Sequence, residues 1–64
     1  METRILRLPE VLKRTGLGKT AVYEAMSRGD FPKSIALLGG RSKGWVEGEI
    51  EAFLQSQIAA SRAA

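Results

Sequence analysis

The sequence of 64 residues contains no cysteine and no histidine. Their absence excludes disulfide bridges and the commonest zinc ligands, so hydrophobic packing has to stabilise this small chain. It also removes the side chains that most often act as general base or nucleophile. The one acidic cluster, Glu47, Glu49 and Glu51, is spaced so that neighbouring carboxylates point to different sides of a helix. We therefore expect no enzymatic activity, no metal site, no cofactor and no small-molecule substrate.

Long apolar runs are missing as well. No stretch approaches the roughly 18 to 20 apolar residues that cross a bilayer, and the first residues lack the apolar core of a signal peptide. Together with the lack of thiols, these features predict a soluble protein of the cytoplasm that does not bind membranes. A chain of this length buries only about 60% of the surface that its unfolded form exposes. We expect one domain over residues 1–64, with a tail that frays from about residue 59.

Positive charge is present in excess and is unevenly distributed. The ten Lys and Arg residues outnumber the seven Asp and Glu residues, which gives a net charge of +3. Residues 1–46 hold nine of the basic residues against four acidic ones, whereas residues 47–64 carry a net charge of −2. A pI near 9.8 with cations concentrated in one part of the chain fits a surface that binds a polyanion. Solubilising charge alone would produce the same balance.

Two short helices are predicted in the first half of the chain. Pro9 begins the first, after a short strand or extended segment at residues 4–8, and Gly16 ends it. The second helix covers residues 19–28, between Gly18 and Gly29. Helical spacing gives each helix an apolar face, formed by Leu8, Val11 and Leu12 in the first and by Val22, Ala25 and Met26 in the second. Two helices joined by a glycine-containing turn, with Leu17 fastening that turn to the core, form a helix-turn-helix pattern.

A β-hairpin and a third helix follow. Residues 34–38 are typical of a strand, and Gly39 and Gly40 supply the positive φ angles of a tight turn. We expect the return strand at residues 43–46 to be brief because Gly44 weakens it. A helix then begins near Val46 or Glu47, where glutamates complement the helix dipole, and its buried face comprises Ile50, Phe53, Leu54 and Ile58. The predicted fold is mainly α-helical with a small β-hairpin, a winged helix-turn-helix.

The outward face of the second helix and the hairpin tip at residues 39–44 carry the side chains best suited to bind DNA. A recognition helix reads base edges in the major groove with residues near its N-terminus, while a basic wing contacts the backbone or the minor groove. We expect a phosphate or guanine contact from Lys19, a base-edge contact from Thr20 and a phosphate contact from Tyr23. The full predicted interface consists of Lys19, Thr20, Tyr23, Ser27 and Arg28 on the helix and Arg41, Ser42 and Lys43 on the wing.

Several of these side chains also fit a purely structural role. A solvated helix face with the ring of Tyr23 half packed on the core would produce the same pattern, as would a charged hairpin tip that merely faces water. Trp45 lies directly before an amphipathic helix, so a place in the core is favoured over stacking on a base.

A series of short motifs is spread over residues 4–56: Leu8-Pro9-Glu10-Val11, Thr15-Gly16-Leu17, Val22-Tyr23, Gly29-Asp30-Phe31-Pro32, Leu38-Gly39, and Gly44-Trp45 followed by Glu49-Ile50 and Phe53. In this order and spacing they resemble the AlpA-type regulators of phages and prophages. The resemblance implies an excisionase-like or MerR-like winged fold and sequence-specific binding of double-stranded DNA. It places the second helix in the major groove with the hairpin beside it.

The sequence departs from the family's pattern around the second helix. Gly18 stands where a serine usually caps the helix, Ala21 where a threonine is common, and Glu24 where an arginine is common. A glutamate repels phosphate, so Glu24 is not expected to contact the backbone, although its carboxylate can accept a hydrogen bond from a cytosine amino group. The residue types expected by the family are kept at Lys19, Thr20, Tyr23, Arg41 and Lys43, and Phe53 keeps an aromatic ring in place of a tryptophan.

Three functions are compatible with the sequence. The favoured one is a transcriptional regulator of a phage or integrated mobile element. An excisionase-type recombination accessory factor would bind DNA by the same mechanism, whereas a protein-interaction adaptor would bind a partner through Tyr23 and the wing. Because one module of this size offers an interface of only about 600–1,000 Å², we expect a homodimer or a cooperative assembly on DNA.

Overall fold

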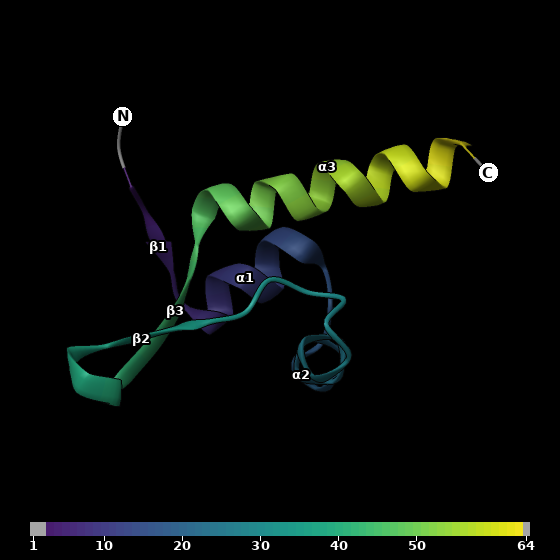
Figure 1. The fold of residues 1–64 in the computed structure, drawn as a ribbon. Helices are drawn as coiled ribbons and strands as arrows, with labels where there is room; N and C mark the ends of the chain where they lie inside the picture. The colour runs from purple at the N-terminus through teal and green to yellow at the C-terminus, as the bar shows by residue number, and fades with distance from the viewer. Residues whose placement is uncertain (1–2, 64) are drawn as a thin grey trace.

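The computed structural model describes residues 3–63, which form three α-helices and a small antiparallel sheet (Figure 1). The elements follow in the order β1 (Ile5–Leu6), α1 (Leu8–Thr15), α2 (Lys19–Arg28), β2 (Ile35–Leu37), β3 (Ser42–Val46) and α3 (Glu47–Ala63), with a 3-10 turn at Leu38–Gly40 between β2 and β3. The prediction of a mainly helical fold with a small hairpin, compatible with a winged helix-turn-helix, is confirmed.

Helices α1 and α2 begin and end close to where their local signals predict. Pro9 occupies the second helical position, not the first, which is still within the turn whose N–H groups have no intrahelical partner. Gly16 and Gly29 end the two helices with φ angles of 74° and 80°. This left-handed conformation is strained for residues with a Cβ. The glycines therefore set the lengths of both helices.

The core takes one fully buried apolar residue from almost every element. The buried side chains are Leu6 of β1, Val11 of α1, Val22 of α2, Phe31 of the loop after α2, Trp45 of β3 and Ile50 of α3. Strand β2 contributes none. Since β2 buries nothing in this core, the hairpin that it forms with β3 extends away from the helices (Figure 1).

Aromatic side chains close one end of this core. The Trp45 indole N–H donates a hydrogen bond to the carbonyl oxygen of Pro32 at 3.0 Å, and the rings of Phe31 and Phe53 lie 4.7 Å apart in a tilted arrangement. Trp45 is only 2% exposed, so the prediction of a core role for it is confirmed.

Strand β3 is the centre of the sheet, because it pairs antiparallel with β1 on one side and with β2 on the other. The prediction that Gly44 weakens this strand is wrong. Gly44 is buried, and a Cβ atom there would overlap the Cγ2 atom of Ile5 and lie 3.1 Å from the carbonyl oxygen of Leu6. The missing side chain lets β1 approach β3 closely, so Gly44 is a packing requirement of the sheet.

The turn of the hairpin is wider than two residues. Leu37 pairs with Ser42, which leaves residues 38–41 outside the ladder. The φ angles are 51° at Leu38, 66° at Gly39 and 96° at Gly40. The expectation of positive φ angles at both glycines is confirmed. The turn places Arg41 at the tip, while Ser42 and Lys43 belong to β3.

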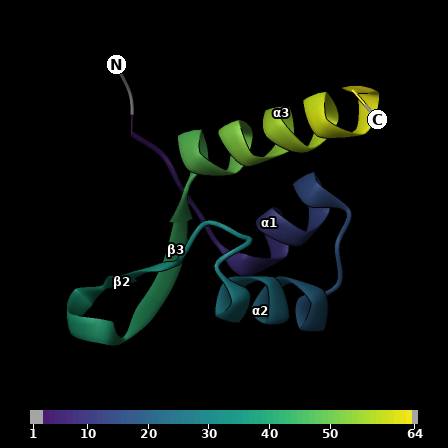
Figure 2. The ribbon, with the colours of Figure 1, turned by 45° about the vertical axis from the view of Figure 1, so that its right-hand side comes forward.

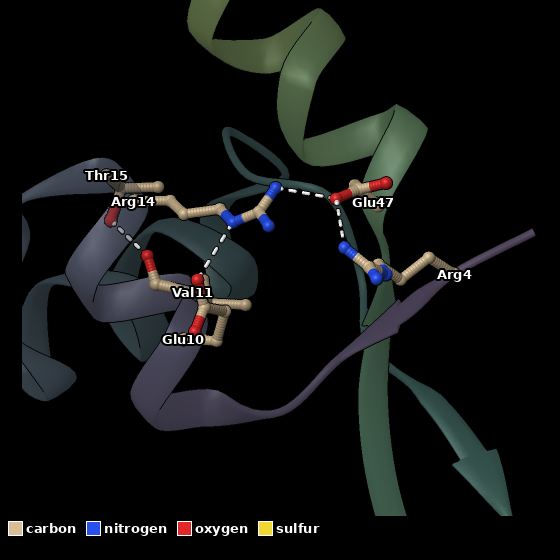
Figure 3. Close-up of polar contacts among 6 residues, drawn as sticks. All are labelled: Arg4, Glu10, Val11, Arg14, Thr15 and Glu47. Carbon is tan, nitrogen blue, oxygen red and sulfur yellow. Dashed lines mark hydrogen bonds and ion pairs between the residues drawn. The ribbon is translucent and has the colours of Figure 1, made fainter.

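Glu47 does more than complement the dipole of α3, because its ion pairs also join α3 to α1 and to the segment directly before β1 (Figure 3). Its Oε2 atom accepts a hydrogen bond from Arg14 Nη1 of α1 at 2.7 Å and lies 3.8 Å from Arg4 Nη1. Arg14 also donates to Glu10 Oε2 at 3.0 Å. The hydrogen bonds to Glu10 and then to Glu47 raise the pKa of Arg14 above its ordinary value. This cluster holds the start of α3 against α1.

Two expectations about the ends of the apolar pattern are wrong. Leu17 and Ile58 are 37% and 43% exposed, because the turn after α1 and the second half of α3 lie beyond the core. Helix α3 continues to Ala63, and fraying of this stretch from about residue 59 stays a prediction. The alanines in this stretch have the highest helix propensity, and Arg62 complements the C-terminal end of the helix dipole.

Candidate nucleic-acid interface

Helix α2 and the tip of the hairpin lie on the same side of the protein, opposite α3. In Figure 1 and in the rotated view of Figure 2, α3 runs along the top, while α2 and the turn between β2 and β3 lie at the bottom. The acidic residues Glu47, Glu49 and Glu51 all belong to the start of α3. The acidic helix is therefore kept away from the predicted recognition helix.

The outward face of α2 is solvent-exposed along its whole length. Lys19, Tyr23 and Ser27 follow one another at intervals of four residues, so they form one row on the helix surface, with Thr20 beside it. Tyr23 is 43% exposed, whereas the neighbouring Val22, which faces the core, is completely buried. The structure thus leaves the Tyr23 ring partly free and does not seal it into the core.

A groove between α2 and the hairpin brings together residues of both parts of the predicted interface. This hollow, which we call the wing groove, has a volume of about 410 Å³. It is lined by Tyr23 of α2, by Arg41, Ser42, Lys43 and Trp45 of the hairpin, and by Arg7, Leu8 and Pro9 at the start of α1. The three predicted wing residues and Tyr23 therefore share one concave surface, and Arg7 adds a third cation that the sequence analysis did not select.

A second hollow also borders Tyr23. This hollow, which we call the Lys33 hollow, has a volume of about 360 Å³ and is lined by Tyr23, Met26, Ser27, Lys33 and Ser34. Tyr23 lines both hollows. Lys33 is a further exposed cation that the sequence analysis missed, because it lies in the loop before β2 and carries no local motif.

The remaining predicted residues lie outside the two hollows. Lys19 and Thr20 are exposed one turn before Tyr23 on α2. Arg28 lies at the C-terminal end of α2, where its Nε atom is 3.4 Å from Oδ2 of Asp30. Both side chains of this pair are about two-thirds exposed, at 66% and 67%, so it adds little stability.

A third hollow differs in character from these two. It has a volume of about 570 Å³ between β1 and α1, and its lining includes Arg4, Arg7, Glu10 and Arg14. Glu10 and Glu47 already engage Arg14, and Glu47 also lies near Arg4. The positive charge of the hollow between β1 and α1 is therefore largely compensated within the protein, so this hollow is a poor site for a polyanion.

Residues 3–63 contain no group of three or more acidic side chains that could hold a metal ion. None of the helices described is both long enough and apolar enough to cross a membrane.

Comparison with known proteins identifies a family and two relatives. Residues 4–58 match the family described as Prophage CP4-57 regulatory protein (AlpA). The chain is 36% identical over 58 residues to the uncharacterized protein ORF88 of Enterobacteria phage P4, an alignment that covers 91% of this chain and 65% of that protein. It is also 40% identical over 60 residues to the DNA-binding transcriptional activator AlpA of Escherichia coli K12. This alignment covers 84% of each chain. No solved structure shows a significant match.

The chain thus spans about two thirds of the length of the phage P4 relative and most of the Escherichia coli one. The family match extends from the start of β1 well into α3, and so includes α2, the hairpin and both hollows beside Tyr23. The resemblance noted in the sequence is confirmed: the chain belongs to the AlpA family of prophage regulatory proteins.

Proposed function

We propose that this protein is a sequence-specific DNA-binding regulator of transcription that inserts α2 into the major groove and lays the β2–β3 hairpin along the adjacent backbone or minor groove. The observation that carries the proposal is the wing groove, where Tyr23 of α2 faces the same concave surface as Arg41, Ser42 and Lys43 of the hairpin. The relative from Escherichia coli is named a DNA-binding transcriptional activator, which supports this proposal.

The dimensions of α2 suit the major groove. An α-helix with its side chains is about 10–12 Å in diameter, and the major groove of B-DNA is about 12 Å wide. The N-terminus of α2 has no side-chain cap at Gly18, so its first N–H groups and the positive end of the helix dipole remain available to a phosphate. Lys19 and Thr20 in this first turn are placed to reach a base edge or a phosphate.

The other polar residues of α2 have more restricted roles. The Ser27 hydroxyl donates a hydrogen bond to the carbonyl oxygen of Glu24 at 2.9 Å, which leaves its lone pairs as acceptors. Glu24 is exposed beside the row of Lys19, Tyr23 and Ser27. Its carboxylate repels phosphate but accepts hydrogen bonds, so we assign it to a cytosine amino group in the target sequence.

The regulated DNA belongs, in this proposal, to a phage or an integrated element, because the matching family and one relative are named for a prophage and a phage. A single module of this size contacts DNA over about 600–1,000 Å². We therefore expect two or more copies to bind cooperatively to neighbouring half-sites.

The experiment is the selection of bound fragments from random duplex DNA, followed by titration of the selected duplex at several salt concentrations. Each phosphate contact contributes about 0.9 to the slope of log K against log salt, which corresponds to about 3.5-fold in affinity between 50 and 200 mM. Lys19→Ala and Arg41→Ala should each flatten the slope by about this amount. Arg62→Ala, which removes an equal charge from the last turn of α3, serves as the matched control.

The proposal is overturned if no sequence is enriched from the random pool. It is also overturned if both variants keep the wild-type slope, because the assigned surface would then be wrong. A protein that leaves duplex DNA unshifted at moderate salt but retains a protein partner would favour the adaptor function.

A further inference from the structure

The turn between β2 and β3 carries only two side chains. Residues 38–41 lie outside the ladder, and because Gly39 and Gly40 contribute none, the side chains of the turn are those of Leu38 and Arg41. A Cβ atom added at either glycine would have no other atom within 4 Å, so the space beside both is open. The hairpin therefore ends in one apolar and one cationic side chain on a slim turn.

Leu38 is unfavourable for the free protein in two respects. Its side chain is 80% exposed, the highest value among the exposed large hydrophobic residues of the described chain, and it does not pack against the core cluster. Its φ angle of 51° is the one positive value outside glycine in residues 3–63. Residues with a Cβ rarely adopt this conformation, and backbone strain of this kind is concentrated at functional sites. A partner that covers the leucine would offset both costs.

We propose that Leu38 enters the minor groove of DNA and wedges its side chain into a base step, with Arg41 beside it. This inference rests on the proposed function, since it requires α2 to lie in the adjacent major groove. It assigns the tip of the hairpin to the minor groove and not to the phosphate backbone. Phosphates offer an apolar side chain no favourable contact, whereas proteins that bind the minor groove insert leucine and similar residues between bases.

The shape and charge of the tip fit this groove. The minor groove is about 6 Å wide, whereas a helix or a two-stranded ribbon needs the major groove of about 12 Å. Two adjacent glycines keep the turn slim, so its two side chains can enter ahead of the strands. Residues 31–46 contain no Asp or Glu, and Arg41 is attracted by the negative potential of a narrow minor groove. The turn and α2 lie on the same side of the protein in both views, so one duplex can contact both (Figures 1 and 2).

A wedge of this kind makes binding depend on the flexibility of the DNA. Pyrimidine–purine steps such as TA and CA unstack most easily, and insertion at such a step bends the duplex toward the major groove. We therefore expect duplexes selected from the random pool to carry a pyrimidine–purine step at a fixed distance from the sequence that α2 contacts. The hairpin then adds specificity at a step where no hydrogen bond to a base is needed.

The test measures binding of Leu38 variants to the selected duplex, labelled at its pyrimidine–purine step with 2-aminopurine, an adenine analogue whose fluorescence rises when it unstacks. Leu38→Gly removes the wedge and should keep or raise the melting temperature, because glycine adopts a positive φ angle without strain. It should bind about tenfold more weakly, which is the order of one lost base-pair contact. It should also lose the preference for the flexible step over a stiff A-tract and the rise in fluorescence.

Two further variants serve as controls for the loss of the leucine. Leu38→Met keeps an apolar side chain at the tip and should retain the step preference and the fluorescence rise. Ile58→Ala shortens an exposed apolar side chain of α3, 43% exposed in the wild type, and should bind as the wild type does.

The salt dependence separates the wedge from the contacts of the cations. Leucine carries no charge and releases no counterion, so Leu38→Gly should keep the wild-type slope of log K against log salt. Arg41→Ala should instead flatten this slope by about 0.9.

Three results would overturn the inference while the proposed function stands. The first is a selected sequence that carries no pyrimidine–purine step at a fixed position. The second is wild-type affinity of Leu38→Gly for the selected duplex, when Lys19→Ala and Arg41→Ala do flatten the salt slope. The third is weaker binding of Leu38→Gly with an undiminished fluorescence rise, which would assign Leu38 to a contact between protein copies. If the wild-type protein selects no duplex, the proposed function fails and the inference fails with it.

Discussion

Replacing Gly44 by alanine tests whether the close approach of β1 to β3 holds the sheet together. The added Cβ would overlap the Cγ2 atom of Ile5 and press on the carbonyl oxygen of Leu6 at 3.1 Å. Ile5 is β-branched and has few alternative rotamers, and the Leu6 carbonyl is part of the backbone. Strand β1 therefore has to move away from its partners Trp45 and Val46.

The expected cost is that of overpacking a well-packed site, about 1–3 kcal/mol of the free energy of unfolding. In a domain of this size each kcal/mol shifts the melting temperature by about 4–8 °C. We therefore expect Gly44→Ala to melt roughly 5–20 °C below the wild type, as followed by circular dichroism of the helices during heating.

Gly48→Ala provides a matched control for this substitution. Gly48 lies in the first turn of α3, and a Cβ there has no other atom within 4 Å. Because alanine has the higher helix propensity, this variant should equal or exceed the wild type in stability, by up to about 1 kcal/mol. The combination of Gly44→Ala with Ile5→Ala should lose less stability than the sum of the two single variants, because the overlap is relieved. A melting temperature of Gly44→Ala at or above that of the wild type would refute the reasoning.

Two further perturbations test the contacts that close the core. Trp45→Phe removes the donor to the Pro32 carbonyl oxygen and part of the buried ring. We expect the free energy of unfolding to fall by about 2–4 kcal/mol, as measured by urea unfolding monitored by circular dichroism. An unchanged transition midpoint would contradict the role given to this hydrogen bond. Glu47→Gln removes the carboxylate shared by Arg4 and Arg14. Its melting temperature should lie below that of the wild type at low salt, and the difference between the two proteins should shrink at high salt. Glu49→Gln, on the exposed side of the same turn, should show neither effect.

The separation of positive and negative charge in this fold is expected to orient the protein as it associates with DNA. Helix α2 and the turn between β2 and β3 lie on the side of the protein opposite α3, whose first turns are acidic (Figure 2). A protein with a net charge of +3 and separated charges is oriented as it approaches a polyanion. The orientation favoured by this separation is the one that presents α2 and the hairpin.

The sequence by itself determined the elements whose signals lie within one or two turns. Gly16 and Gly29 end their helices because left-handed φ angles are accessible to glycine, and helical spacing predicts that Val22 is buried while the neighbouring Tyr23 is exposed. The core position of Trp45 follows from its size and its place before an amphipathic helix. For the same reason, the exposure of the outward face of α2 could be predicted without coordinates.

Only the tertiary structure decided which distant residues meet. In the sequence, Gly44 predicts a weakened strand. Its role in packing becomes apparent only when Ile5 is placed against it. Arg14 and Glu47 are 33 positions apart, and no local pattern pairs them. Arg7 and Lys33 have no local pattern that distinguishes them from other surface cations, and only the fold places each of them in a hollow with Tyr23. Hydrogen-bonded turns depend on neighbours in the chain, whereas hollows and ion pairs between elements depend on how those elements pack, which short-range spacing does not encode.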